Sequence, residues 1–450
     1  MGEITPSMER KWTNSITIPA TIPATPTAFE VLYHCPCFHY IQFLLGGRPY
    51  VQLPKKNLLR LIKLVRFFVP TLLLMMFATD FGDWLINGEA AMKFQQTRII
   101  SMLTYLDSQF GLWLGTATTF IFMYKGDRLL HCAESLGMTM KLLDMLPFPE
   151  SGPKRPFGLK VAWVILSVLS AFSLFRGIYG VWEAIDPTFL YEPRIYFLWL
   201  VPKGIIAAVL KTFFLLSELS ALPIYVVFTY VCAKFTRCFQ KLNKGIGELI
   251  ERVERQEFKQ PFVEQLKELS LKEVTLAQSV IDLDDCFAVQ VLFFVVNNSL
   301  GVFSKIAKCF IASAFINWID YVKFVMKSSM YVLGLAIIIV FPAMLHESSN
   351  RSNTLWQKLI AVRQEKRQKD YSPEEGEVLI TLLQRTTFRQ HSLTVAGMAN
   401  LTRSFGVTLL LGFAGFTCFL IDRAENYKVQ EISFNSTCNC TLFEFNDSVV

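Results

Sequence analysis

Seven runs of mostly apolar residues limit the folds that are open to this chain of 450 residues. A transmembrane helix needs roughly twenty such residues to cross about 30 Å of hydrocarbon, and each run is near or above that length. Hydrophobic residues make up 52% of the chain, which is more than soluble domains use. The sequence therefore predicts an all-α membrane protein with seven transmembrane helices. The predicted spans are 63–79, 99–124, 159–182, 205–232, 286–310, 323–345 and 401–421.

The distribution of basic residues predicts the orientation of these spans. Most of the 44 lysines and arginines fall before the first span or within 125–160, 234–285 and 346–390. Basic residues accumulate on the cytoplasmic side of membrane proteins. We therefore expect a multi-pass plasma-membrane protein with a cytoplasmic N-terminus and an extracellular C-terminus. That orientation is the reverse of a G-protein-coupled receptor.

The C-terminal tail gives a second indication of the same orientation. It carries three N-x-S/T sequons, at Asn435, Asn439 and Asn446, together with Cys438 and Cys440. Glycan transfer and stable thiol oxidation both occur on the lumenal or extracellular side. The tail is therefore expected outside the cell and glycosylated, while the oxidation state of its two cysteines stays open.

The predicted cytoplasmic segments are long and have a helical pattern. Apolar residues recur at helical spacing, as at Ile246, Leu249, Ile250 and Val253, with charged residues between them. We expect spans four and five to continue into the cytoplasm as helices that pack together as an anchor domain. The predicted order is a cytoplasmic segment 1–62, helices one to four in 63–233, a cytoplasmic extension 234–285, helices five and six in 286–345, anchor helices in 346–400, helix seven in 401–422 and a tail 423–450.

One stretch resembles a known family. Residues 382–422 read LLQRTTFRQHSLTVAGMANLTRSFGVTLLLGFAGFTCFLID, which is an amphipathic helix, a small-residue turn at 396–399 and a last span with Ser, Thr and Gly. This stretch resembles the C-terminal signature of the arthropod gustatory and odorant receptor superfamily. Typical gustatory receptors have Thr-Tyr and a later Gln-Phe here, whereas Cys418 follows Thr417 in this chain. The resemblance is therefore to a divergent gustatory receptor or a gustatory-receptor-like protein.

The resemblance implies a ligand-gated, non-selective cation channel built from four copies of the chain, or from this chain and related receptor subunits. The last span would surround a central pore, and residues near 374–400, including Leu382 and Leu383, would hold the tetramer. The implied ligand is a sugar or another small tastant, and a light- or oxidant-sensing member of the superfamily is an alternative. The implied pore-lining residues are Ser404, Val407, Leu411, Ala414, Gly415, Cys418 and Asp422.

Polar and aromatic residues in spans two to six are candidates for a ligand pocket. Ionisable groups at membrane depth are costly unless they are paired or face a cavity, and aromatic rings enclose small ligands. Tryptophans near span ends also serve as interfacial anchors, and Asp107 could simply pair with Arg176 or Lys211. The candidates are Tyr105, Asp107, Trp113, Arg176, Tyr179, Trp182, Trp199, Lys211, Trp318, Tyr321 and Tyr331.

The sequence gives no indication of an enzyme, a metal site or a cofactor. It has no phosphate-binding Gly-rich loop, no His and Cys set at metal spacing and no nucleophile beside a base. The net charge of +7 reflects the cytoplasmic segments of a membrane protein, so no nucleic-acid partner is expected. The remaining alternative is a polytopic protein that is not a channel, either a transporter or an inverted-topology receptor, although no internal repeat of the transporter kind is found.

The predicted topology can be tested directly. A C-terminal epitope should bind antibody on intact cells, whereas an N-terminal epitope should require permeabilised cells. Glycosidase should lower the apparent mass of the protein unless Asn435, Asn439 and Asn446 are all replaced by Gln. A C-terminal epitope that is reached only after permeabilisation would contradict both the orientation and the resemblance.

Overall fold

A computed structural model gives the fold of the chain. It describes residues 126–143, isolated positions between 164 and 185, and the segments 194–196, 199–201, 204–255, 262–309, 318–365, 373–388 and 392–422. The predicted spans 63–79 and 99–124, most of 159–182 and the tail with its three sequons lie outside the described residues.

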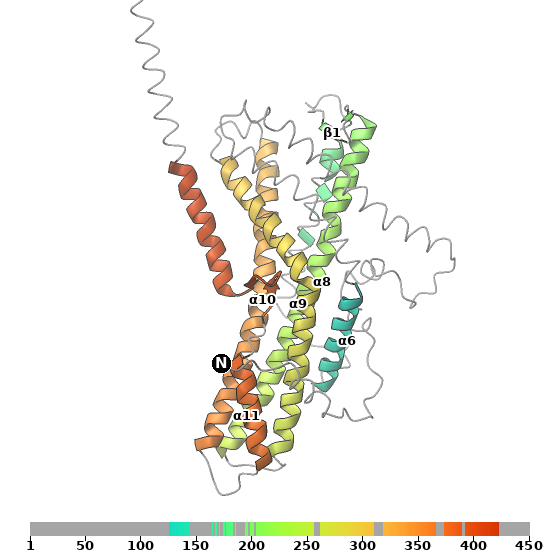
Figure 1. The fold of residues 1–450 in the computed structure, drawn as a ribbon. Coiled ribbons are helices and arrows are strands. Elements are labelled where there is room, and N and C mark those ends of the chain that lie inside the picture. The colour runs from blue at the N-terminus through green and yellow to red at the C-terminus, as the bar shows by residue number, and fades with distance from the viewer. Residues whose placement is uncertain are drawn as a thin grey trace, which may run out of the picture.

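Three long helices form the frame of the molecule (Figure 1). They are α8 (Ile205–Arg255, 51 residues), α9 (Phe262–Cys309, 48 residues) and α10 (Trp318–Glu365, 48 residues). A helix of that length extends about 72 Å, which is more than twice the hydrocarbon thickness of a bilayer. Each helix therefore continues well beyond the apolar run within it.

Shorter elements pack around this frame. The helix α6 (Gly126–Leu142) lies beside α9, and α11 (Pro373–Phe388) packs against α10 and α9. Two antiparallel hairpins are formed by β1 (Arg194–Tyr196) with β2 (Trp199–Val201), and by β3 (Thr394–Val395) with β4 (Ala399–Asn400). The last described element is the helix Arg403–Asp422, called the C-terminal helix below.

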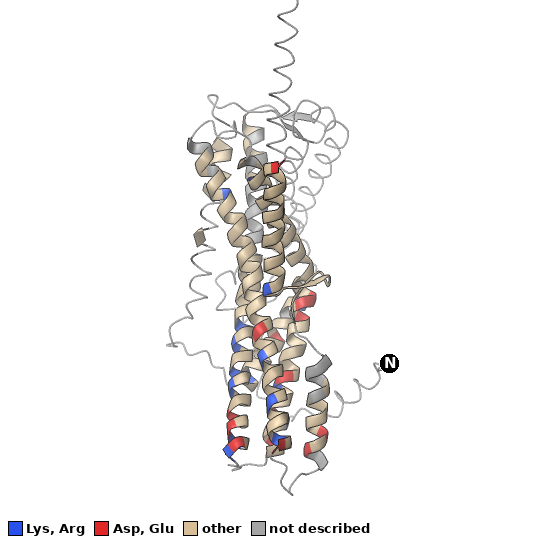
Figure 2. Cartoon of the chain, turned by 90° about the vertical axis from the view of Figure 1, so that its left-hand side faces the viewer, with Lys and Arg blue, Asp and Glu red and all other residues tan. Residues whose placement is uncertain are grey.

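Charge divides the bundle into two parts. Figure 2 shows that Lys, Arg, Asp and Glu gather on the lower part of the long helices and that the upper part is almost free of them. Among the described residues, three helices are long and apolar enough to cross a membrane: Phe262–Ala307, Phe324–Glu365 and Arg403–Asp422. The upper part of the bundle therefore suits hydrocarbon and the lower part suits water.

A continuous apolar core joins the two parts. The rings of Phe228 on α8 and Phe287 on α9 meet at 5.3 Å between centroids, and Trp356 of α10 is fully buried. The lower end of α11 is fixed by Glu375, whose two carboxylate oxygens accept hydrogen bonds from Arg363 of α10 at 2.5 and 3.1 Å. A bidentate, largely buried pair of this kind fixes geometry as well as adding energy.

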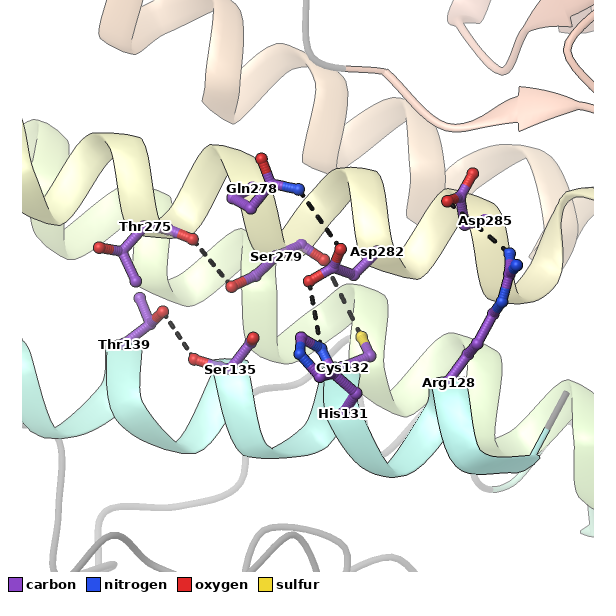
Figure 3. A network of polar contacts seen from close by, with 10 residues as sticks. All are labelled: Arg128, His131, Cys132, Ser135, Thr139, Thr275, Gln278, Ser279, Asp282 and Asp285. Atoms are coloured by element: carbon purple, nitrogen blue, oxygen red, sulfur yellow. Dashed lines mark hydrogen bonds and ion pairs between the residues drawn. The ribbon is translucent and has the colours of Figure 1, made fainter. Parts of the chain in front are cut away.

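The helix α6, which the sequence did not predict, docks on the lower part of α9. Figure 3 shows two polar contacts between α6 and α9: the ion pair Arg128–Asp285 at 3.8 Å, and His131 beside the carboxylate of Asp282 at 3.6 Å. The side chains of Arg128 and His131 are largely exposed, so these contacts contribute little, and the buried apolar face of α6 supplies most of the contact. Cys132 lies on that face, and burial raises the pKa of its thiol well above the usual range.

One close approach depends on a missing side chain. The ring of Tyr331 on α10 lies against Gly301 of α9, and a Cβ atom added at Gly301 would fall 2.4 Å from the nearest ring carbon. Any larger residue would force the ring or the helices apart. Gly301 therefore sets how closely α9 and α10 pack in the apolar part of the bundle.

Gly301→Ala should destabilise the protein by about 1–3 kcal/mol, the usual cost of overpacking a core. The matched control is Gly247→Ala, because Gly247 also lies inside a helix but has no heavy atom within 4 Å of its added Cβ. That control should leave stability unchanged or raise it by up to about 1 kcal/mol. Thermal midpoints in one detergent measure both effects, and equal shifts for the two variants would contradict the packing described.

Candidate functional site

The C-terminal helix is the least buried of the long apolar helices that the structure describes. Only 11% of its most apolar stretch of 18 residues is buried, whereas the corresponding stretches of α9 and α10 are 56% and 44% buried. The helix starts after Thr402, whose hydroxyl oxygen accepts a hydrogen bond from the Phe405 N–H at 3.3 Å as a cap. Figure 1 shows the helix at the side of the bundle, rising from the β3–β4 hairpin.

One face of this helix contacts the bundle. The ring of Phe303 on α9 meets the rings of Phe413 and Phe416 edge to face, at 4.9 and 4.8 Å between centroids. A Cβ added at Gly406 would lie 3.0 Å from Ile339 of α10, so Gly406 permits a close contact there. At the base, Arg403 donates a hydrogen bond to Glu347 of α10 at 2.7 Å. The helix is thus held at its base and through one aromatic cluster higher up.

The opposite face is exposed, and it carries the predicted pore-lining residues. Residues at this spacing share one face of a helix. Val407 and Leu411 are 54% and 68% exposed, which is unusual for large apolar side chains of a single chain unless lipid or another subunit covers them. All seven predicted residues are exposed in the structure: Ser404, Val407, Leu411, Ala414, Gly415, Cys418 and Asp422.

The small-residue turn that precedes the helix forms the tip of the β3–β4 hairpin. Ala396 and Gly397 occupy the turn, and Met398 N–H donates to Val395 O at 2.9 Å. The hairpin rests on α9, where the carboxylate of Asp284 accepts hydrogen bonds from both the N–H and the hydroxyl of Thr394, at 2.6 and 2.7 Å. The base of the C-terminal helix is therefore tied to α9 as well as to α10.

A second cluster of interest lies between α8, α9 and α10 in the apolar part of the bundle. Asn298 of α9 donates a hydrogen bond to the Tyr225 hydroxyl of α8 at 2.8 Å, and the Tyr225 ring stacks on Phe294 at 3.7 Å between centroids. Tyr331 of α10 is buried, and the ammonium of Lys327 lies 5.4 Å from the centre of its ring. Aromatic rings with a few polar groups are typical of small-molecule sites.

The sequence predicted Tyr331 in this region but missed Tyr225, Phe294 and Asn298. The available signal was the pair Asn297–Asn298, because two adjacent amides inside an apolar run are costly in hydrocarbon unless they have partners. Tyr225 and Phe294 had no such signal, since aromatic residues are common throughout the spans.

The other predicted pocket residues are more scattered. Tyr321 is 55% exposed and lies ten residues before Tyr331 on α10. Tyr179 and Trp182 meet edge to face at 5.8 Å, and Trp182 is 51% exposed. Lys211 is in α8, Trp199 is in β2 and Trp318 begins α10, whereas Tyr105, Asp107, Trp113 and Arg176 lie outside the described residues.

A cavity of about 770 Å³ opens between α8 and α10 in the charged part of the bundle. It shares Glu347 with the base of the C-terminal helix. Its charged lining residues are Lys244, Glu248, Glu251, Glu347 and Arg351. In the part of the chain that the structure describes, no group of three His, Cys, Asp or Glu side chains could hold a metal ion.

The prediction that Leu382 lies between subunits is wrong. Its side chain is fully buried against helices of its own subunit, so a charged replacement would disrupt the subunit itself. On the same helix Ile380 is exposed, as is Met398 at the hairpin tip. These two residues, rather than Leu382, are available to another subunit, and the side chain of Leu383 lies outside the described residues.

Comparison with known proteins identifies the fold. No family model and no curated protein matches the sequence. The solved structure of the insect olfactory receptor OR5 from Machilis hrabei matches with a TM-score of 0.61 over 87% of this chain and 99% of that chain, at 11% identity. The structure of the same receptor in complex with eugenol matches with a TM-score of 0.59 over 85% and 96% of the two chains, also at 11% identity. The chain therefore has the fold of an insect olfactory receptor.

Proposed function

We propose that this chain is a chemosensory receptor of the gustatory kind, acting as a ligand-gated, non-selective cation channel. Three features support the proposal: the fold shared with an insect olfactory receptor, the resemblance of residues 382–422 to the receptor signature, and the division of the bundle into an apolar and a charged part. In the proposed topology the charged part and the N-terminus are cytoplasmic, and the tail with its sequons is extracellular.

The observation that carries the channel proposal is the exposed face of the C-terminal helix. A helix with an apolar face that its own subunit leaves uncovered needs lipid or other subunits around it. Its two faces differ, because one packs on Phe303 while the other presents small and apolar residues in a stripe. Four copies placed around an axis would turn that stripe toward a central pore.

The chemistry of the stripe suits a gated pore. Rings of Val407 and Leu411 would form an apolar constriction, which closes to ions by excluding water. Ala414 and Gly415 leave space for the helix to rotate, and Asp422 would place a ring of carboxylates at the extracellular mouth. Such a ring raises the local concentration of cations.

The cluster around Tyr225, Asn298 and Tyr331 is the proposed ligand site. It lies in the apolar part of the bundle and combines aromatic rings with amide and hydroxyl groups. A small ring-bearing molecule whose polar groups pair with these amide and hydroxyl groups would suit it. Eugenol in the OR5 complex is a ligand of that receptor, and the ligand proposed here is a sugar or another tastant.

A hydrophilic substitution in the constriction tests the channel without a known ligand. Leu411→Thr should wet the closed pore and raise the ligand-free cation current of purified protein in planar bilayers, by about tenfold or more if dewetting forms the gate. The matched control is Leu409→Thr. Leu409 lies two residues before Leu411 on the same helix, but its side chain packs against the bundle.

The outcome separates a pore from a packing surface. Leu409→Thr should leave the ligand-free current at the level of the unmodified protein. Equal currents from the two variants would show that the exposed stripe does not line the ion path. Absence of cation current from the unmodified protein and from Leu411→Thr alike would favour a polytopic protein that is not a channel.

A further inference from the structure

The C-terminal helix is joined to α11 by a short segment, of which the structure describes residues 392–402, called the hairpin joint below. The joint contains β3, the turn, β4 and the cap Thr402. Whatever fixes the joint also fixes the base of the C-terminal helix.

The joint has little internal support. Its two strands are two residues each, so the ladder between them is minimal. The turn places Ala396 at a φ of 51° and Gly397 at 76°, and the left-handed region is unfavourable for a residue with a side chain. A hairpin this short and strained keeps one conformation only when its surroundings hold it.

Asp284 of α9 supplies the principal polar contact. One carboxylate oxygen accepts the N–H of Thr394 at 2.6 Å and the other accepts its hydroxyl at 2.7 Å. The same hydroxyl oxygen accepts the N–H of Gly397 at 2.9 Å, so the contact extends into the turn. One helical turn further along α9, Ala288 O accepts the N–H of Ala396 at 3.1 Å. Hydrogen bonds to a carboxylate are among the stronger ones.

Apolar contacts hold the joint in place without fixing its angle. Leu393, Val395 and Leu401 are buried in the core beside α9. Such contacts are not directional, whereas hydrogen bonds are. Asp284, with two of the three hydrogen bonds described between the joint and α9, therefore contributes most to the orientation of the joint on that helix.

The orientation matters because the C-terminal helix acts as a long lever. Its twenty residues extend about 30 Å, so a change of 10° in tilt at the base moves the far end by about 5 Å. Above the base, the contacts that resist such a tilt include the Phe303 cluster, the approach of Gly406 to Ile339 and the packing of Leu409 against the core.

We propose that Asp284 is the positioning residue of the C-terminal helix, and that its two hydrogen bonds to Thr394 set the tilt of that helix and thereby the balance between closed and open pores. The inference rests on the proposed function, since tilt regulates conduction only if the helix lines a pore. Asp284 itself lies on α9, away from the exposed stripe and from the Tyr225 cluster.

The tilt can be measured from a native thiol on the exposed face. Cys418 is exposed on the C-terminal helix, whereas Cys132 and Cys238 are buried, and burial raises the pKa of the Cys238 thiol to about 12. A spin label on Cys418 therefore reports the distance between C-terminal helices of neighbouring subunits by dipolar electron paramagnetic resonance. The exposed Cys309 and the four cysteines outside the described residues are replaced by Ser; these four are Cys35, Cys37, Cys438 and Cys440.

In Asp284→Ala the distance distribution between labels on Cys418 should widen by roughly twofold or more, because a base without its hydrogen bonds samples a range of tilts. The matched control is Asp285→Ala, which removes the adjacent, exposed carboxylate paired with Arg128 and should leave the distribution unchanged. Thr394→Val removes only the hydroxyl hydrogen bonds and should give an intermediate width. If the Asp284→Ala protein does not assemble, the width measured for Thr394→Val decides the test alone.

A second label position distinguishes positioning from general loosening. Cys309 is exposed at the end of α9, and labels there, in protein with Cys418→Ser, should keep their distribution in Asp284→Ala. Equal widening at Cys309 and Cys418, or a Cys418 distribution that matches the Asp285→Ala control, would overturn the inference. Absence of any dipolar distance in the unmodified protein would show a monomer and overturn the proposed function with it.

Current recording tests the link to gating. In protein that carries Leu411→Thr, adding Asp284→Ala should change the ligand-free current by about threefold or more in either direction, the effect of losing a hydrogen bond that differs between two states. Adding Asp285→Ala should leave that current unchanged. Equal currents in the two double variants would overturn the proposed role in gating even if the tilt changes.

Discussion

The requirement that every backbone polar group be satisfied inside hydrocarbon determines the rest of this structure. Hydrocarbon offers no hydrogen-bond partner, so a chain can cross it only as continuous helix or closed barrel. The helices α9 and α10 contain apolar stretches long enough for such a crossing. Together with α8 they then continue as the charged part of the bundle. The same long helices therefore connect the Tyr225 cluster in the apolar part with the cavity and α11 in the charged part.

The C-terminal helix is arranged differently from that frame. It is short, it is tied at its base to Asp284 of α9 and Glu347 of α10, and one face is left exposed. An element with a fixed base and few contacts above it can change tilt at a low free-energy cost, as switching elements must. The proposed channel thus combines a rigid frame that binds a ligand with a lightly held helix that lines the pore.

Local features were predictable from the sequence, and long-range partners were not. The predicted span 401–421 agrees with the helix Arg403–Asp422, and the turn at 396–399 is the hairpin tip, because hydropathy and small residues are local signals. The partnership of Asp284 with Thr394 joins residues 110 positions apart, and no periodicity encodes it. Leu382 was misplaced because an amphipathic pattern identifies an apolar face without saying which subunit covers it.

The central claim is that the exposed stripe of the C-terminal helix lines an ion path, and its most direct test is thiol block at Cys418. A cationic methanethiosulfonate reagent should attach a positive charge beside permeating ions and reduce the cation current of the Leu411→Thr protein. The same protein with Cys418→Ser should keep its current under the reagent, which excludes effects at other cysteines. The account would be contradicted if the current stays unchanged although mass spectrometry shows that Cys418 has been modified. A charge in the path of a cation cannot leave conduction unaltered.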